Sequence, residues 1–355
     1  MKKTLLILLS LFVLLVVYLL AWPIPVAPVA WTPPVPPAFA GDYAPNTYLA
    51  DVERLDLPSG YGPEDVAVDS LGRIYGGLQD GRIIRMQHDG SNAETFADTG
   101  GRPLGLAFDS TGHLIVADAF EGLLSVSPEG EIIVLSTEAD GVPFAFANDV
   151  DVGPDGVIYF SDASSKYDQH HYKWDLVESR PNGRLLAYDP ATGVTSTLLD
   201  DLYFANGVAV SPDGTFLLVN ETTRYRVRRY WLDGPRQGES EVILDNLPGF
   251  PDGISSNGAG VYWMAVPSPR NALLDNLAPS PFIRKMILRL PEAMQPAPER
   301  YAFVLGLDGD GRIVHNLQNP SGEPFAIITS VEQVGDVLYL GSLEEPALAR
   351  VAVPE

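Results

Sequence analysis

Beyond about residue 47 the chain alternates short apolar runs with turns rich in Gly, Asp and Pro. Apolar and polar residues alternate within the runs, which is the period-two pattern of strands, and helical periodicity is scarce. One strand–turn–strand template recurs six times, as PEDVAVDSLGRIYGG (63–77), PLGLAFDSTGHLIVAD (103–118), ANDVDVGPDGVIYFSD (147–162), ANGVAVSPDGTFLLVN (205–220), PDGISSNGAGVYWMAV (251–266) and ITSVEQVGDVLYLGS (328–342). Further strand-like segments follow the copies. The pattern predicts an all-β fold, a six-bladed β-propeller with a central channel, over residues 46–355.

A propeller ring is usually sealed by a strand from one terminus that pairs into the last blade. The segments TYLADVERLDL (47–57) and ALARVAV (347–353) have strand character and lie near the two ends of the predicted ring. We therefore expect these two segments to pair and close the propeller.

The residue before the first strand of each copy forms an informative column. It reads Glu64, Leu104, Asn148, Asn206, Asp252 and Thr329. The innermost strand of every blade lines the channel of a propeller, so equivalent positions converge on its axis. Four of the six residues carry carboxylate or amide oxygens, and these are expected to face one another.

Two carboxylates and two amides suit a hard divalent cation, and Ca²⁺ tolerates such an irregular oxygen shell. Zinc prefers His or Cys, and neither stands in the column. The alternative is that Asn and Asp only cap turns at strand starts. Because four oxygens share one axis, we predict Ca²⁺ as the cofactor, held by Glu64, Asn148, Asn206 and Asp252.

The first 45 residues differ in character from the rest. Lys2 and Lys3 precede an uncharged apolar run from Thr4 to Trp22, which is long enough to span a bilayer as a helix. The alternative, a cleaved signal peptide, usually has a shorter apolar core. We expect residues 1–22 to be a transmembrane signal anchor with the globular domain on the exported side, or secreted if cleavage occurs. Seven prolines in residues 23–37 predict an extended spacer within a linker of residues 23–45.

Composition excludes several classes of partner and site. The 355 residues carry a formal net charge of −23, which argues against nucleic acid as a partner because phosphate binding needs clustered Lys and Arg. Cysteine is absent, which excludes disulfides, a thiol nucleophile and a Cys-type zinc site. With 46% hydrophobic residues the chain has enough apolar surface for a large core.

Long stretches of the sequence resemble a known family. NDVDVGPDGVIYFSDASSKY, FANGVAVSPDGTFLLVNETTRYRVRRYWL and DNLPGFPDGIS are similar to the strictosidine-synthase-like and adipocyte plasma-membrane-associated protein family, and the resemblance covers roughly residues 50 to 350. It implies a membrane-anchored six-bladed propeller with arylesterase-like activity. The wider superfamily of gluconolactonase, regucalcin and paraoxonase hydrolyses lactones or esters with a calcium ion in the channel.

Carried over to this sequence, the resemblance makes Glu64, Asn148, Asn206 and Asp252 the ligands of a catalytic calcium ion. It also makes Asp65 and Asp149 candidate ligands of a second, structural ion. The alternative for these two is a strand-start aspartate that accepts a hydrogen bond from a neighbouring backbone N–H.

Two departures from the family pattern bear on the chemistry. Paraoxonase-like members place a histidine in the second-blade column, where this chain has Leu104, and true strictosidine synthases carry a catalytic glutamate where it has Thr329. A lyase of the strictosidine synthase type is therefore disfavoured. No separate general base is identified, and the candidates are His170, His171, Glu221 and Asp149.

The first hypothesis is therefore a calcium-dependent hydrolase whose partner is a small ester or lactone and whose metal polarises the carbonyl. The alternative is a non-catalytic, membrane-tethered binding module with structural calcium. Five apolar residues flank the column and are expected to form a wall suited to aromatic or acyl groups: Leu104, Phe144, Phe146, Phe204 and Phe250. Ordinary packing between blades is the other explanation for them.

Overall fold

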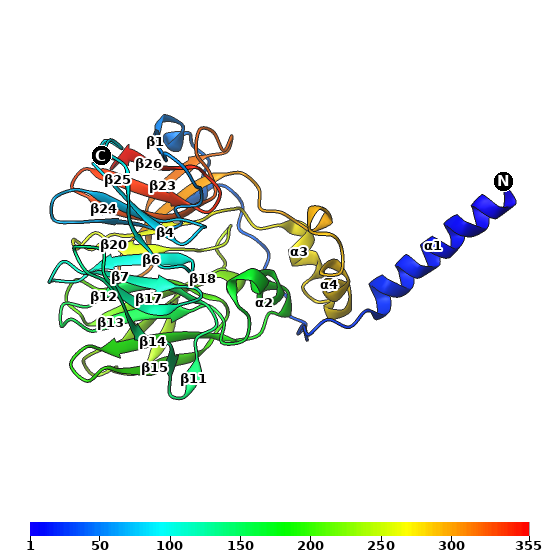
Figure 1. Cartoon of the computed structure of the whole chain (residues 1–355), viewed down its shortest axis with the longest axis horizontal. Coiled ribbons are helices and arrows are strands. Elements are labelled where there is room, and N and C mark those ends of the chain that lie inside the picture. The colour runs from blue at the N-terminus through cyan, green and yellow to red at the C-terminus, as the bar shows by residue number, and fades with distance from the viewer. Residues whose placement is uncertain (355) are drawn as a thin grey trace.

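The computed structural model describes residues 1–354 and contains the predicted propeller (Figure 1). Six antiparallel four-stranded sheets form the blades. The first three are β2 (Val66–Val68), β3 (Ile74–Gly77), β4 (Arg82–Met86) and β5 (Glu94–Asp98); β6 (Pro103–Phe108), β7 (Leu114–Asp118), β8 (Gly122–Val126) and β9 (Ile132–Ser136); and β12 (Ala147–Val152), β13 (Ile158–Asp162), β14 (Gly183–Asp189) and β15 (Val194–Leu202).

The other three blades are β16 (Ala205–Val210), β17 (Phe216–Glu221), β18 (Arg226–Trp231) and β19 (Ser240–Leu244); β20 (Ile254–Ser256), β21 (Tyr262–Ala265), β22 (Ala302–Leu307) and β23 (Ile313–Asn319); and β24 (Ile328–Val334), β25 (Val337–Ser342), β26 (Ala347–Ala352) and β1 (Glu53–Asp56). Each copy of the repeated template forms the inner two strands of one blade.

The Pro-Asp-Gly and related turns explain why the template is repeated. Gly156 and Gly214 sit in the turns of the third and fourth inner hairpins with φ of 84° and 71°. This left-handed backbone conformation is open to glycine at no steric cost, and it lets the chain reverse tightly between two strands.

Apolar faces of neighbouring blades pack against each other to form the core. Between the first two blades, the Tyr75 ring contacts Phe96 and Phe108 edge to face, with ring centroids 5.1 and 5.0 Å apart. Leu114 and Val116 of β7 are fully buried in the same cluster. Because every blade has two such faces, each sheet depends on both of its neighbours.

The ring is closed in the predicted way. β1 from the N-terminal side pairs antiparallel with β26 from the C-terminal end, and Leu55 lies opposite Leu348. Leu348 is fully buried and Leu55 nearly so. The predicted pairing of the two terminal segments is thus confirmed.

Two insertions and several short elements extend from the ring. The insertion between β13 and β14 holds η3 (Gln169–His171) and α2 (Tyr172–Glu178), and the one between β21 and β22 holds α3 (Ala272–Leu277), α4 (Pro281–Ile287) and η5 (Glu292–Met294). The remaining short elements are η1 (Gly41–Tyr43), η2 (Tyr48–Asp51), η4 (Thr222–Arg224), β10 (Glu138–Ala139) and β11 (Val142–Pro143). In Figure 1, α2, α3 and α4 lie on the same side of the propeller as α1.

The N-terminal helix α1 (Lys2–Ala21) has no buried residue and is long and apolar enough to cross a membrane (Figure 1). It is the only such helix within residues 1–354.

The predicted proline-rich spacer is extended, but it does not hold the propeller away from the N-terminal helix as expected. Residues 23–45 lie along the propeller as a strap. Val26 is buried, and the Pro25 carbonyl accepts a hydrogen bond of 3.0 Å from the Tyr167 hydroxyl. Phe39 packs with Tyr301 and Phe303 at ring-centroid distances of 5.9 and 6.1 Å. The apolar residues between the prolines have surface to cover, so the segment is held down instead of projecting into solvent.

Removing the closing strand is expected to cost far more stability than its length suggests. Deletion of residues 344–355 removes β26 from between β25 and β1, so a thermal melt of the shortened chain should lose the main unfolding transition or shift it down by more than about 10 °C. Deletion of residues 354–355 alone is the control and should leave the midpoint nearly unchanged. An unshifted midpoint in the longer deletion would show that the ring does not depend on β26.

Candidate metal centre in the channel

All six column residues line one cavity of about 240 Å³, which opens toward α2, α3 and α4 and is called here the helix-side chamber. A second cavity, the turn-side chamber, is also about 240 Å³ and lies along the inner strands toward their turns. Glu64, Asn148, Asn206 and Thr329 line both. The column therefore forms the floor between two chambers, and equivalent positions of the blades converge as the repeat predicts.

Backbone and hydroxyl contacts between blades fix the spacing of the column. The Thr329 hydroxyl donates to the Glu64 carbonyl at 2.6 Å, and the Gly253 N–H donates to the Thr329 carbonyl at 2.9 Å. The Gly207 N–H donates to the Asp252 carbonyl at 3.1 Å. A Cβ on Gly207 would come within 2.4 Å of that carbonyl oxygen, which explains the glycine after Asn206.

The side chains of the column leave oxygens free for a ligand. The Asn206 amide nitrogen donates to the Thr222 hydroxyl at 3.2 Å, and that hydroxyl donates to the Pro251 carbonyl at 2.8 Å. With its nitrogen engaged, Asn206 has its amide oxygen as the free end. Within residues 1–354, the carboxylate of Glu64 and the side-chain amide of Asn148 form no hydrogen bond to another residue, although both residues are buried.

Keeping both carboxylates of the column ionised is electrostatically costly. Burial, and then the charge of Asp252, raise the pKa of Glu64 well above its usual range, and burial raises the pKa of Asp252 to about 7. Arg102 is fully buried nearby and opposes the shift of the Glu64 pKa, but its guanidinium Nη1 donates to the Gly77 carbonyl at 3.0 Å. Two buried like charges with amide oxygens beside them are a donor set that fits a hard cation.

The set contains two charged and two neutral ligands. Nowhere in residues 1–354 do three or more His, Cys, Asp or Glu side chains gather as a metal site. The predicted site instead combines two carboxylates with two neutral amides, which leaves the assignment of Ca²⁺ to these residues a prediction.

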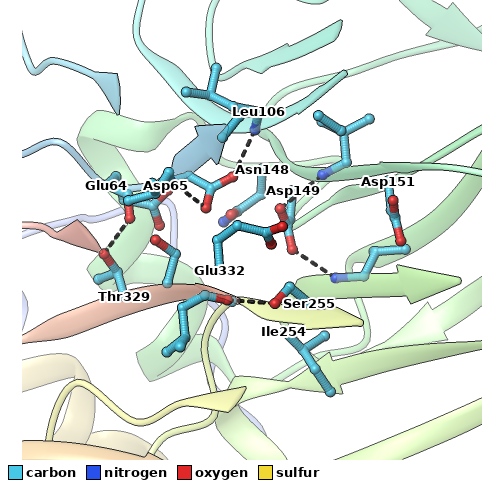
Figure 2. Close-up of a pocket in the computed structure, with 18 of the residues that line it drawn as sticks. Glu64, Asp65, Leu106, Asn148, Asp149, Asp151, Ile254, Ser255, Thr329 and Glu332 are labelled. Atoms are coloured by element: carbon cyan, nitrogen blue, oxygen red, sulfur yellow. Dashed lines mark hydrogen bonds between the residues drawn. The ribbon is translucent and has the colours of Figure 1, made fainter. Parts of the chain in front are cut away.

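Three aspartates of the turn-side chamber join neighbouring blades (Figure 2). Asp65 accepts hydrogen bonds from the N–H of Val66 in its own strand and of Leu106 in the next blade, at 2.7 and 2.8 Å. Asp149 accepts from Val150 and Val208 at 2.9 and 2.8 Å, and Asp151 accepts from Val152 and Val210 at 2.7 and 2.8 Å. These contacts match the alternative role of strand-start aspartates, and binding of a second ion by Asp65 and Asp149 stays a prediction.

The same chamber holds acidic groups that the column does not identify. Asp151 and Glu332 both line it, and Figure 2 shows Glu332 beside Asp149. Burial raises the pKa of Asp151 to about 6 and that of Glu332 to about 8. Asp151 follows Asp149 by two residues on one strand, so period-two alternation is the signal that places both on the channel face.

Three of the candidate bases, His170, His171 and Glu221, do not line either chamber. The His170 ring packs against Phe120 in a tilted arrangement with ring centroids 4.8 Å apart, and His171 Nδ1 lies 2.7 Å from Asp168 Oδ1. Glu221 is fully buried and forms an ion pair with Arg226 at 2.5 Å, which ties β17 to β18. The general base is therefore not found among these three residues.

The apolar wall is largely as expected. Leu104, Phe146, Phe204 and Phe250 line the helix-side chamber, and the rings of Phe146 and Phe204 meet edge to face at 5.6 Å. Phe144 does not line the chamber and follows the alternative, because its ring packs against Phe160 in the cluster between the second and third blades. The helical insertions complete the wall with four residues that the repeat does not indicate, namely Leu176, Leu274, Ile287 and Leu288.

The fold and the site together define a six-bladed β-propeller with an oxygen-lined channel centre under an apolar chamber. Residues 148–235 match the family model for strictosidine synthase, and residues 41–86 match the model for the N-terminal part of strictosidine synthase-like proteins. Protein STRICTOSIDINE SYNTHASE-LIKE 6 of Arabidopsis thaliana is 39% identical over 311 residues, which cover 86% of this chain and 82% of that protein. The chain belongs to the strictosidine synthase-like family.

A second relative comes from an animal. Adipocyte plasma membrane-associated protein of Bos taurus is 36% identical over 341 residues, which cover 89% of this chain and 82% of that protein.

Solved structures support the same fold. A gluconolactonase from Xanthomonas campestris superposes with a TM-score of 0.63 at 17% identity, covering 94% of this chain and 99% of that one. A calcium-binding protein, regucalcin, from Agrobacterium tumefaciens gives a TM-score of 0.61 at 17% identity, covering 84% and 93%. At this level of identity the likeness shows the propeller fold alone.

The blade-joining role of Asp149 can be separated from ion binding. Asp149→Asn leaves one carbonyl-type oxygen for two backbone donors, so the free energy of unfolding should fall by about 1–3 kcal/mol with chelator present. Asp151→Asn is the matched variant, because it weakens the same kind of hydrogen bonds between blades two residues further along β12. Urea unfolding with chelator measures both. A loss for Asp149→Asn that appears only when calcium is added would instead assign Asp149 to an ion.

Proposed function

We propose that this protein is a calcium-dependent hydrolase of esters or lactones that acts in the helix-side chamber. The observation that carries the proposal is the convergence of four oxygen-bearing side chains, two of them carboxylates, on the floor of an apolar cavity. Solved proteins of the same fold include a gluconolactonase and the calcium-binding protein regucalcin, which supports this choice of chemistry.

Glu64, Asn148, Asn206 and Asp252 would hold the calcium ion, and the ion would supply Lewis-acid stabilisation of the oxyanion formed from a substrate carbonyl. Carboxylates provide the charge, and the amides provide neutral oxygens that limit repulsion between ligands. Calcium accepts six to eight oxygen ligands, so four protein side chains leave room for substrate and water.

The chain's own residues would perform the other tasks. The apolar wall of Leu104, Phe146, Phe204 and Phe250 would take the acyl or aryl part of the substrate out of water. Asp252 keeps partial exposure to the chamber, so its carboxylate can orient the attacking water by accepting a hydrogen bond from it.

We further propose that α1 anchors the protein in a membrane and that the propeller lies on the exported side. The apolar length of α1 and the two lysines before it support this orientation, since positive charge flanking a helix tends to stay on the cytoplasmic side. The Bos taurus relative is named for its association with a plasma membrane.

One observation favours a second candidate function, a non-catalytic binding module with structural calcium. Leu104 and Thr329 occupy column positions where a reactive group is expected, and no histidine lines either chamber in the described part of the chain. In that case the ion would stabilise the ring without turnover.

Metal removal and return test the hydrolase directly. The full chain, stripped with chelator, should lose hydrolysis of phenyl acetate and of simple lactones and regain it with added Ca²⁺. Asn148→Ala removes a ligand and Asp252→Asn removes one of the two charges of the ligand set, so activity should fall by at least about 100-fold at fixed calcium. Asp245→Asn, an exposed carboxylate seven residues earlier, is the control and should retain full activity.

The outcomes of this assay separate the two functions. Calcium that raises the melting temperature without any turnover would favour the binding module. Turnover that is the same with chelator and with calcium would refute a calcium-dependent hydrolase.

Calcium affinity should depend on pH in a stated direction. Burial raises the pKa of Asp252 to about 7, so protons compete with calcium for this carboxylate at and below neutral pH. Affinity measured by calorimetry should therefore fall as pH decreases from about 8 to about 6, by up to about tenfold per pH unit for each proton displaced. Asp252→Asn should make the profile shallower, with the remaining dependence due to Glu64, whose pKa is also raised. An affinity that does not change over this range would contradict the assigned ligand.

A further inference from the structure

The end of α1 is fixed directly to the helical insertions. Arg289 follows α4 and is buried, and its side chain donates from Nε to the Trp22 carbonyl at 2.8 Å and from Nη1 to the Leu19 carbonyl at 2.7 Å. Carbonyls in the last turn of a helix lack partners within the helix, and a cation there also interacts favourably with the helix dipole. The point at which α1 ends therefore lies against α4.

The strap continues this attachment along the insertions. The Val29 N–H donates to the Glu178 carbonyl at the end of α2 at 3.0 Å, and Arg284 of α4 donates to the Val177 carbonyl at 2.7 Å and also to the Val29 carbonyl. α1, the strap, α2 and α4 thus form one connected unit. If α1 spans a bilayer, the side of the propeller that carries the insertions faces the membrane surface (Figure 1).

The insertion that holds α3 and α4 exposes large apolar side chains. The exposed fractions are 53% for Leu273, 58% for Phe282, 42% for Ile283 and 67% for Met294. Large exposed apolar residues gathered on one insertion are typical of surfaces that rest in the interfacial layer of a membrane.

The same helices line the helix-side chamber from within. Leu274 lies next to the exposed Leu273, and Ile287 lies on α4 with the exposed Phe282 and Ile283. One short insertion therefore carries apolar side chains on the outside and on the chamber wall. This arrangement joins the surface that faces the membrane to the column at the channel floor.

From this geometry we infer that Leu273, Phe282, Ile283 and Met294 insert into the bilayer surface, and that the helix-side chamber takes lipophilic esters or lactones directly from the membrane. The inference rests on the proposed hydrolase and on the proposed anchor, and it adds the substrate class and the route of entry. A molecule that partitions into lipid would reach the column without crossing bulk water.

The absence of cysteine from the chain allows a clean test of the contact. Phe282→Cys and Met294→Cys in the full chain each receive one environment-sensitive dye, and the protein is reconstituted in phosphatidylcholine vesicles with a lipid-borne nitroxide quencher. Leu71→Cys is the control, since Leu71 is 75% exposed in the turn between β2 and β3, at the opposite end of the inner strand from Glu64. Leu11→Cys, in the middle of α1, reports on the anchor.

The expected result is strong quenching at positions 282, 294 and 11 and little at position 71. Labels at 282 and 294 that behave like the label at 71, while position 11 is quenched, would overturn the contact with the bilayer. A label at position 11 that is not quenched would remove the anchor on which the inference depends.

Kinetics test the route of entry. The double variant Phe282→Asp, Ile283→Asp changes residues that do not line the chamber, so hydrolysis of water-soluble phenyl acetate should stay within about twofold of wild type, while the KM for a long-chain aryl ester held in vesicles should rise by about tenfold or more. Equal effects on both esters would contradict entry from the membrane. If the wild type hydrolyses neither ester, the hydrolase proposal fails, and the quenching experiment still decides whether this surface contacts lipid.

Discussion

The pairing of β1 with β26 is the constraint on which the channel depends. A propeller blade cannot bury both of its faces unless a neighbour stands on each side, so the ring is stable only when it is closed. Closure also forces the six inner strands to converge, and this convergence places Glu64, Asn148, Asn206 and Asp252 around one axis. The proposed metal centre is therefore a consequence of a contact between the two ends of the domain.

The same convergence concentrates acidic groups in a buried channel. In the turn-side chamber, backbone N–H donors offset the cost of burying these acidic groups. Asp65, Asp149 and Asp151 each accept two hydrogen bonds from backbone N–H groups and so join neighbouring strands. In the column the carboxylate of Glu64 has no such donor within residues 1–354. The aspartates of the turn-side chamber therefore hold the ring together, whereas the Glu64 carboxylate has no protein partner. This contrast is the basis for placing the proposed calcium ion at the column.

Much of this structure could be predicted from the sequence because repetition aligns equivalent positions. The six hairpins, the column and the closing strand all follow from the template. The strap could not be predicted, since a proline-rich run indicates an extended chain but not the surface on which it lies, as Phe39 against Tyr301 shows. Phe144 follows the alternative of packing between blades, since only its neighbour Phe146 faces the chamber, and Leu274 and Ile287 belong to insertions that have no counterpart in other blades.

The most direct test of the central claim is to locate the ion. Crystals of the protein grown with calcium should show an anomalous peak on the channel axis, with oxygens of Glu64, Asn148, Asn206 and Asp252 at about 2.3–2.6 Å from it, whether or not a second peak lies at Asp65 and Asp149. A channel without a peak at saturating calcium, or a single peak among Asp65, Asp149 and Glu332 instead, would contradict the account.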